Sequence, residues 1–227
     1  MEILHISDTH SYHDLLKIPE NIDIVIFSGD CSNWRNPITN EPEVRDFIDW
    51  FSKLPMLYKV FVAGNHDSSI ESGLVSREDF SANNIIYLEN EDVTIEGFKI
   101  WGSPYTPTFG NWCFMKQRSK LDKLWQSIPV DTNIIVVHTP PKGVLDLSYS
   151  REHELEFCGC SALKKRVVKL PNLKLVCFGH IHNNKDITNA GIMKLSNQDT
   201  IFSNGSVVTD GKFGKLSSQG NIIELNK

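Results

Sequence analysis

The feature that most constrains the fold is a series of short, mostly apolar runs rich in β-branched residues, with segments of helical period between them. Runs of this kind are typical of strands that are buried on both faces, as in parallel sheets. Strands that alternate with helices indicate an α/β fold. The runs expected to form buried strands are residues 3–6, 24–27, 58–62, 134–137 and 173–178.

The segments between these runs predict helices and some antiparallel pairing. Apolar residues at i, i+3, i+4 and i+7 predict helices over 43–53, with Pro42 in the first turn, and near 116–128. A third helix is expected at about 160–170. Residues 92–95 and 98–101 flank Glu96-Gly97 as in a hairpin, and further strands are expected at 200–202, 206–208 and 222–225. We therefore expect one α/β domain over 1–227, with sheets of mixed direction.

Composition excludes several classes of protein. The chain has 23 basic and 28 acidic side chains, a net charge of −5, which argues against stable binding of nucleic acid through bulk charge. A membrane-spanning helix needs about 20 apolar residues, and every apolar run here is shorter. The first residues lack the basic and apolar regions of a signal peptide. A cytoplasmic protein without a membrane segment is expected.

The 5 cysteines do not form a recognisable metal or disulfide pattern. Their number is odd, and the close pair Cys158-Gly159-Cys160 offers too few ligands for a zinc site. We expect reduced thiols in the core, with 158–160 forming a turn that leads into a helix.

Polar side chains follow each of the five buried runs. In open α/β sheets, ligands collect at the carboxyl ends of strands, because the loops there converge on one crevice. These five ends carry Ser7-Asp8-Thr9-His10, Ser28-Gly29-Asp30, Gly64-Asn65-His66-Asp67, His138, and Gly179-His180-Ile181-His182. Histidine nitrogen and carboxylate oxygen suit zinc, iron or manganese. The residues suffice for two ions, which about 3.5–4 Å apart would hold a hydroxide and clamp a phosphoryl group.

These motifs, in this order, resemble the motif set of the calcineurin-like metallophosphoesterase superfamily. The combination of Gly-Asn-His-Asp with Gly-His-x-His is specific, whereas either alone is weak. Two further segments are similar to the corresponding motifs of the small metallophosphoesterase-domain proteins. They are His138-Thr-Pro-Pro-x-Gly143-x-x-Asp146 and Gly159-Cys160-x-x-Leu163. Class III cyclic nucleotide phosphodiesterases resemble the chain less closely.

The resemblance implies two mixed β-sheets packed as a sandwich flanked by helices, with a dinuclear centre of manganese, iron (Fe²⁺ or Fe³⁺), zinc or nickel. Attack on phosphorus by a metal-bridging hydroxide would hydrolyse a small phosphodiester or nucleotide, including 2′,3′-cyclic nucleotides. His66 would stabilise the transition state or protonate the leaving oxygen, and Asp67 would orient His66 through its second ring nitrogen. One ion would be held by Asp8, His10, Asp30 and His182, and the other by Asp30, Asn65, His138 and His180.

Two departures from the superfamily narrow the expected activity. No Asp-Arg-Gly follows Asp30, which argues against a protein phosphatase, and residues 183–227 leave little room for the capping domain of the repair nucleases. A nuclease, a phosphomonoesterase and a non-catalytic interaction scaffold on the same fold remain alternatives.

Some residues are expected to lie outside this chemistry. His5, His13 and His153 fall in no motif and are expected to be structural, with His13 the first exception to consider because it follows His10 on the same loop. Gly29, Gly64 and Gly179 are compatible with turns. The irregular segment 102–115 is expected to be a surface excursion rather than a loop over the site.

Overall fold

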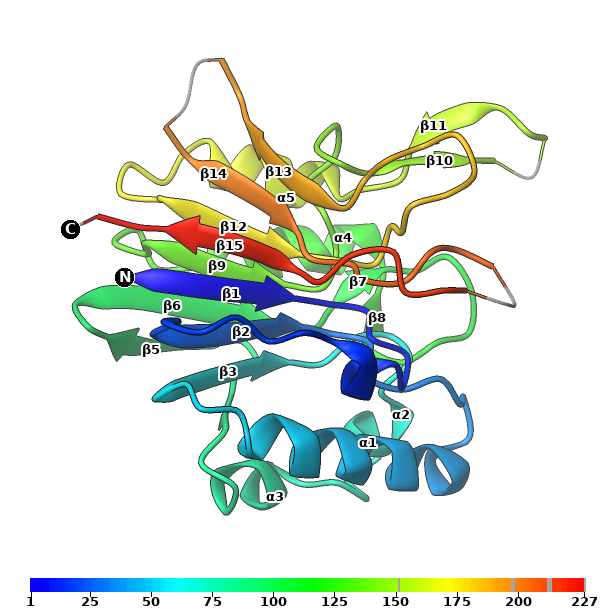
Figure 1. Ribbon diagram of the computed structural model, residues 1–227. Helices are drawn as coiled ribbons and strands as arrows, with labels where there is room; N and C mark the ends of the chain where they lie inside the picture. Colours follow the sequence, from blue (N-terminus) through cyan, green and yellow to red (C-terminus); the bar gives the residue numbers. More distant parts are fainter. Residues whose placement is uncertain (151, 197–198, 212–213, 227) are drawn as a thin grey trace.

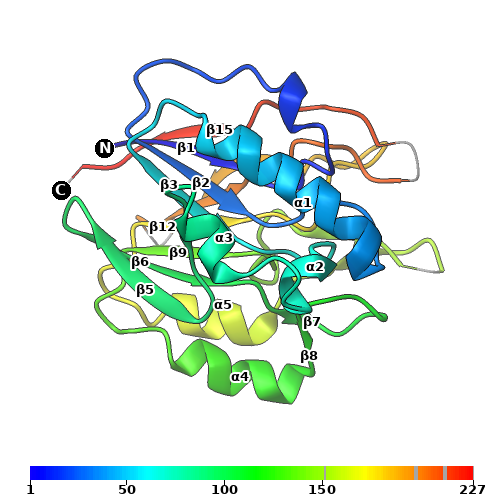
Figure 2. The ribbon, with the colours of Figure 1, turned by 90° about the horizontal axis from the view of Figure 1, so that it is seen from below.

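The computed structural model describes all residues except 151, 197–198, 212–213 and 227. Two β-sheets face each other, and helices cover the outer face of each, so the molecule has four layers (Figure 2). The predicted sandwich of two mixed sheets flanked by helices is therefore confirmed.

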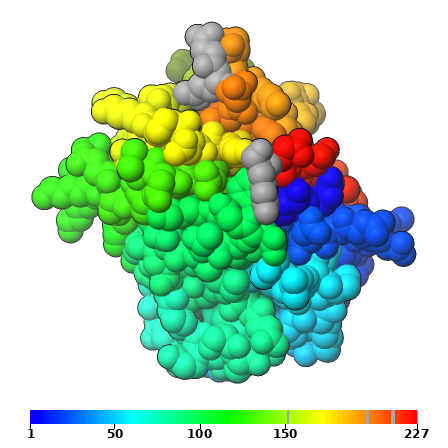
Figure 3. All heavy atoms as spheres, turned by 90° about the vertical axis from the view of Figure 1, so that its left-hand side faces the viewer, coloured from blue at the N-terminus to red at the C-terminus, as the bar shows by residue number. Residues whose placement is uncertain are grey.

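The first sheet has the strand order β15-β1-β2-β3-β4. Its parallel strands are β1 (Glu2–Ile6), β2 (Ile24–Ser28), β3 (Tyr58–Val62) and β4 (Ile86–Tyr87). The strand β15 (Asn221–Glu224) pairs antiparallel with β1, which brings the first and last strands of the chain side by side (Figure 3).

The second sheet has the order β13-β14-β12-β9-β6-β5. Its central strands are mutually parallel, and the edge strands β5 and β13 are antiparallel to their neighbours. The bounds are β5 (Glu91–Ile95), β6 (Phe98–Ser103), β9 (Ile134–Val137), β12 (Leu175–Phe178), β13 (Gly191–Lys194) and β14 (Ile201–Asn204). Two small pairs are β7 (Thr106–Pro107) with β8 (Met115–Lys116) and β10 (Leu147–Tyr149) with β11 (Leu155–Phe157).

Alternation along the strands divides the core into three layers of side chains. In β2, Ile24 and Ile26 pack between the sheets, whereas Val25 and Phe27 pack under the helices. The first sheet is covered by α1 (Pro37–Ser52), α2 (Ser68–Glu71) and α3 (Arg77–Ser81), with the 3-10 turn η1 (His13–Leu15) nearby. The second is covered by α4 (Arg118–Gln126) and α5 (Ser161–Val167).

Two predicted elements differ from the structure. The helix expected at 43–53 begins at Pro37, because Asn36 caps it through a bond from the Ile38 N–H at 3.0 Å, and Pro42 lies inside it. The strand expected at 206–208 was wrong: Ser206 and Val208 make isolated bridges to Ser7 and Leu216. At its start this segment runs parallel to the chain just after β1, through a single bridge to Ser7, and it forms no strand.

His5 lies between the two sheets, as a structural residue. Its ring nitrogens contact the hydroxyl groups of Ser203 at 2.7 Å and Ser28 at 2.9 Å. Burial lowers the pKa of His5 to about 3, although Asp8 opposes the shift. The ring is therefore neutral in the folded protein at pH values well above 3.

This burial predicts a pH dependence of stability. Below pH 6.5 the unfolded chain binds a proton at His5 that the folded chain rejects, so stability falls as the pH drops from about 6.5 toward 3. One such group lowers the free energy of unfolding by about 2 kcal/mol between pH 7 and pH 5. Urea denaturation in EDTA at pH 7 and pH 5 measures the effect. His5→Gln should be less stable than the wild type at pH 7, but its free energy of unfolding should fall by about 2 kcal/mol less than that of the wild type between the two pH values. An equal loss in both proteins would contradict a buried neutral ring.

None of the helices in the described part of the chain combines the length and the hydropathy needed to span a bilayer.

Candidate metal centre

The parallel strands of both sheets deliver the predicted residues to one edge of the sandwich, opposite the edge where the two termini lie (Figure 1). The structure assembles two groups of candidate metal ligands there. One atom of each residue lies within 4.8 Å of the others in its group. The first group is Asp8, His10 and His182, and the second is Asp30, His138 and His180.

Asp30 lies between the two groups. Its carboxylate is 3.3 Å from His138 Nε2 and 3.9 Å from His10 Nε2, which belong to different groups. The amide oxygen of Asn65 is 3.1 Å from His138 Nε2 and so faces the second group. Asp30 therefore lies where the shared ligand is expected, and Asn65 lies on the side of His138, while the binding of metal by these residues stays a prediction.

Backbone carbonyl groups at the end of β2 and in the loop that follows it fix the orientation of three histidine rings. The Nδ1 atom of His138 donates to the Ser28 carbonyl at 2.8 Å, and that of His10 donates to the Ser32 carbonyl at 3.0 Å. His66 Nδ1 donates in the same way to the Asn33 carbonyl at 3.0 Å. Each ring therefore directs Nε2 toward the site, as is usual for a metal-ligating or acid–base histidine.

The charges of the site suit cations. Burial would raise the pKa of both carboxyl groups, but contact with His182 lowers the pKa of Asp8, and contact with His138 holds the pKa of Asp30 well below its usual range. Burial lowers the pKa of His10 to about 4 and that of His180 to about 3, so these rings are neutral and able to bind a metal. Burial opposes protonation of His138, but Asp30 outweighs it and raises the pKa to about 9. A bound cation would take the place of that proton.

The backbone at the site adopts conformations that side chains disfavour. Asp8, His10, Asp30 and His180 all have positive φ, between 43° and 70°. Such conformations cost free energy and persist where the surrounding contacts determine them. Here the contacts include the Asp8 carboxylate, which accepts from the Ser206 hydroxyl at 2.7 Å and from the His180 N–H at 3.0 Å. Ser206 lies in no motif, so no sequence signal identified it.

The motif glycines allow close packing against the ligands rather than only permitting turns. A Cβ atom on Gly64 would collide with the Asp30 carboxylate, and one on Gly179 would collide with the Asp8 carboxylate. A Cβ on Gly29, which has φ +107°, would lie 2.5 Å from His138 Nδ1. Each of these glycines is therefore required by the packing of a ligand side chain.

Asp67 does not contact the second ring nitrogen of His66, so the prediction that it orients that ring directly was wrong. Its buried carboxylate accepts hydrogen bonds from the backbone N–H groups of Asp30, Cys31, Ser32 and Gly64, at 2.7–3.2 Å. The hydroxyl of Ser32 adds a bond of 2.7 Å. Asp67 thus joins the loop after β2 to the loop after β3, because backbone N–H groups of both loops donate to its carboxylate.

Asp67→Asn should therefore destabilise the fold. An amide offers one acceptor oxygen and sets an NH₂ group against buried N–H donors, which is expected to lower the free energy of unfolding by about 3 kcal/mol. Urea denaturation measures the loss, and the exposed Asp186→Asn is the matched control. Stability within about 0.5 kcal/mol of the control would contradict this role for Asp67.

The segment 102–115 lies over the site, which corrects the expected surface excursion. Trp112 packs on His66 with ring centroids 4.2 Å apart, and Phe109 packs near His180 at 5.2 Å. The Cys113 N–H donates to the Asn65 carbonyl at 3.2 Å and anchors the segment. These contacts join residues that are distant in the sequence, so periodicity did not reveal them.

The remaining histidines and the cysteines mostly follow expectation. His13 is buried against Phe47 and Trp50 and contacts Asp46 at 3.2 Å, outside both ligand groups, and His153 is exposed. Cys31, Cys113, Cys160 and Cys177 are buried free thiols. Cys158 is the exception, because it is partly exposed and lines a cavity at the site.

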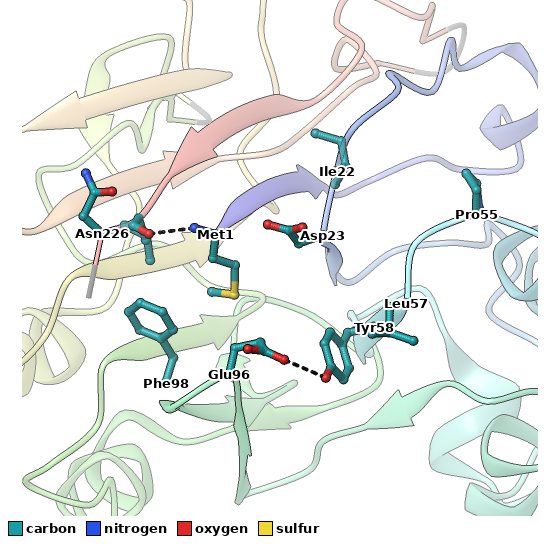
Figure 4. Close-up of a pocket in the computed structure, with 10 residues that line it drawn as sticks. Met1, Ile22, Asp23, Pro55, Leu57, Tyr58, Glu96, Phe98 and Asn226 are labelled. Atoms are coloured by element: carbon teal, nitrogen blue, oxygen red, sulfur yellow. Dashed lines mark hydrogen bonds between the residues drawn. The ribbon is translucent and has the colours of Figure 1, made fainter.

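Two cavities meet at the candidate centre. One of about 480 Å³ is lined by Asp30, Asn65 and His180, and by Phe109 and Arg118 farther out. The other, of about 700 Å³, is lined by His10, Asn33 and Thr209. Both share His66, Trp112, His182 and Asp210. A further hollow of about 630 Å³ lies at the amino ends of the strands, between Met1, Tyr58 and Phe98, and contains neither ligand group (Figure 4).

Comparison with known proteins identifies the family of the chain. The family model of the calcineurin-like phosphoesterases matches residues 1–184, and the chain belongs to this family. It is 31% identical to the human metallophosphoesterase domain-containing protein 1, over 90% of this chain and 65% of that protein. It is 29% identical to a UPF0046 protein of Caenorhabditis elegans, over 93% of this chain and 71% of that protein. The DNA double-strand break repair protein Mre11 of Saccharolobus solfataricus is 23% identical, over 95% of this chain and 58% of that protein.

The family uses two divalent metals, and the two ligand groups fit that requirement in number and in donor chemistry. The chain spans 65% of the length of the human relative, which is less than two thirds of that protein.

Proposed function

We propose that the chain is a phosphodiesterase that hydrolyses small phosphodiesters, including 2′,3′-cyclic nucleotides, with two divalent ions such as manganese. The observation that carries the proposal is the pair of cavities that meet at the two ligand groups and at His66. An acyclic diester has two separate ester arms, one for each cavity, whereas a 2′,3′-cyclic nucleotide carries both ester oxygens on one ribose and would place that ribose and its base in one cavity. A phosphomonoester would use only one.

The residues of the site would have two roles, which are metal binding and proton donation. Two divalent ions, when bound, supply charge neutralisation at phosphorus and a nucleophile at neutral pH. One ion would be held by Asp8, His10 and His182, and the other by Asn65, His138 and His180. Both ions would be held by Asp30. His66, oriented by the Asn33 carbonyl, directs Nε2 into the cavities and can give a proton to the leaving oxygen.

Activity on a panel of substrates tests the proposal. Protein loaded with manganese is expected to hydrolyse bis(p-nitrophenyl) phosphate and at least one cyclic nucleotide faster than p-nitrophenyl phosphate or single-stranded DNA. Hydrolysis of the monoester or of DNA alone would favour the phosphomonoesterase or the nuclease. No turnover with two ions bound would favour a scaffold.

We also propose that the protein works in the cytoplasm, supported by its free thiols, which persist in a reducing compartment. Fractionation of cells with an antibody against the chain tests this placement.

A further inference from the structure

Three side chains from separate parts of the sequence form a stack beside the metal centre. The guanidinium carbon of Arg35 lies 3.5 Å from the ring centroid of Trp112. The ring of His66 lies 4.2 Å from Trp112 between centroids, with 37° between the ring planes. Arg35 follows β2, His66 follows β3, and Trp112 belongs to the segment between β7 and β8.

The two neighbours of Trp112 lie on opposite faces of the indole. A guanidinium and an imidazole that both lie about 4 Å from one centroid would overlap if they shared a face. The cavities agree, because Trp112 lines the metal cavities together with His66 and lines a separate surface pocket together with Arg35. Trp112 is therefore held between Arg35 and His66, with an attractive cation–π contact on the outer face.

His66 has little else to hold its ring. One hydrogen bond joins Nδ1 to the Asn33 carbonyl, and the ring edge meets His10 with centroids 4.8 Å apart. A single hydrogen bond allows the ring to tilt about it. Transfer of a proton needs the donor nitrogen and the acceptor oxygen within about 2.6–3.2 Å of each other. A displacement of the donor by about 1 Å can lower the rate a hundredfold. The face of Trp112 blocks the tilt.

Trp112 itself is placed by its backbone. The Cys113 N–H donates to the Asn65 carbonyl at 3.2 Å, and the Phe114 N–H donates to a Glu71 carboxylate oxygen at 2.7 Å. The indole is thus tied to the same Gly-Asn-His-Asp motif that carries His66.

We propose that Trp112, supported by Arg35, is a positioning residue that holds the His66 ring for proton donation to the leaving oxygen. This inference rests on the proposed function, because it assigns His66 that role. Trp112 acts on the step that breaks the bond to the leaving oxygen and not on metal binding.

Substrates with different leaving groups test the proposal. The alkoxide released from 2′,3′-cyclic AMP needs a proton, whereas p-nitrophenolate leaves without one. In the manganese-loaded protein, Trp112→Leu should lower kcat for 2′,3′-cyclic AMP about 10–100-fold and leave the metal content little changed. The kcat for bis(p-nitrophenyl) phosphate should fall less than about threefold. Trp112→Phe should restore most of the loss. The neighbouring exposed Trp34→Leu is the matched control.

A double-mutant cycle separates positioning from a general loss of structure. In a His66→Ala background, Trp112→Leu should cost no further activity on 2′,3′-cyclic AMP, because the group that it positions is gone. Additive losses, or equal losses on both substrates, would overturn the proposal.

If the wild-type protein hydrolyses neither diester, the proposed function fails and the positioning can still be decided. Nitrogen-15 NMR of the zinc-loaded protein should show a protected His66 Nδ1 proton that Trp112→Leu exposes to rapid exchange. An unchanged signal in Trp112→Leu would overturn the inference.

Discussion

Asp30→Asn is expected to produce the largest loss of any single change, with metal content falling from two ions to one or none per chain and turnover falling by at least about 10³-fold. Asp30 is the side chain shared by both ligand groups, with His10 at 3.9 Å and His138 at 3.3 Å from its carboxylate. A neutral amide cannot balance two cations, and its single oxygen bridges them poorly. Metal analysis of the purified protein, together with diesterase assays in excess manganese, measures both effects.

The matched control for this variant is Asp210→Asn. Asp210 lines both cavities but belongs to neither ligand group, so the change alters the charge of the same region by the same amount. We expect two ions to remain in this variant. Two ions in Asp30→Asn as well would show that Asp30 is not the shared ligand.

His66→Ala should lower the turnover of 2′,3′-cyclic AMP, whose leaving alkoxide needs a proton, by about 10²–10⁴-fold. The two metal ions should stay in place, because His66 lies outside both ligand groups. Its ring faces the cavities with Nδ1 committed to the Asn33 carbonyl at 3.0 Å. Steady-state kinetics and metal analysis on the same preparation make the measurement.

The control for this change is the exposed His153→Ala, for which neither quantity should move. If His66→Ala loses metal, His66 is a metal ligand and its assignment as the proton donor is wrong. If it keeps both its metal and its rate, another group donates the proton.

The strands and their polar ends could be predicted because both are local properties of the chain. The runs 24–27 and 134–137 correspond closely to β2 and β9, since buried parallel strands need unbroken apolar sequence. Asp30 and His138 come directly after these strands, and parallel pairing brings the strand ends to one edge. Residues from both sheets therefore met at the expected place.

Other parts of the site depend on contacts that local pattern does not reveal. The hydrogen bonds of Asp67 to the loop after β2 require that two loops already lie side by side. Trp112 covers His66 because the segment between β7 and β8 bonds to the Asn65 carbonyl, and nothing in the composition of 102–115 indicates that direction. Helix α1 began before its predicted start because the cap at Asn36 carries no apolar period.

Local pattern was enough to predict the class of fold, the residues at the strand ends and the chemistry that those residues can support, because hydrophobic period and donor type can be read from neighbouring positions. Contacts between distant segments then placed Asp30 between the two candidate ligand groups and packed Trp112 against His66. The reason is geometric. Ligand sharing depends on distances of 3–4 Å between residues that the chain separates by as many as 174 positions, as for Asp8 and His182.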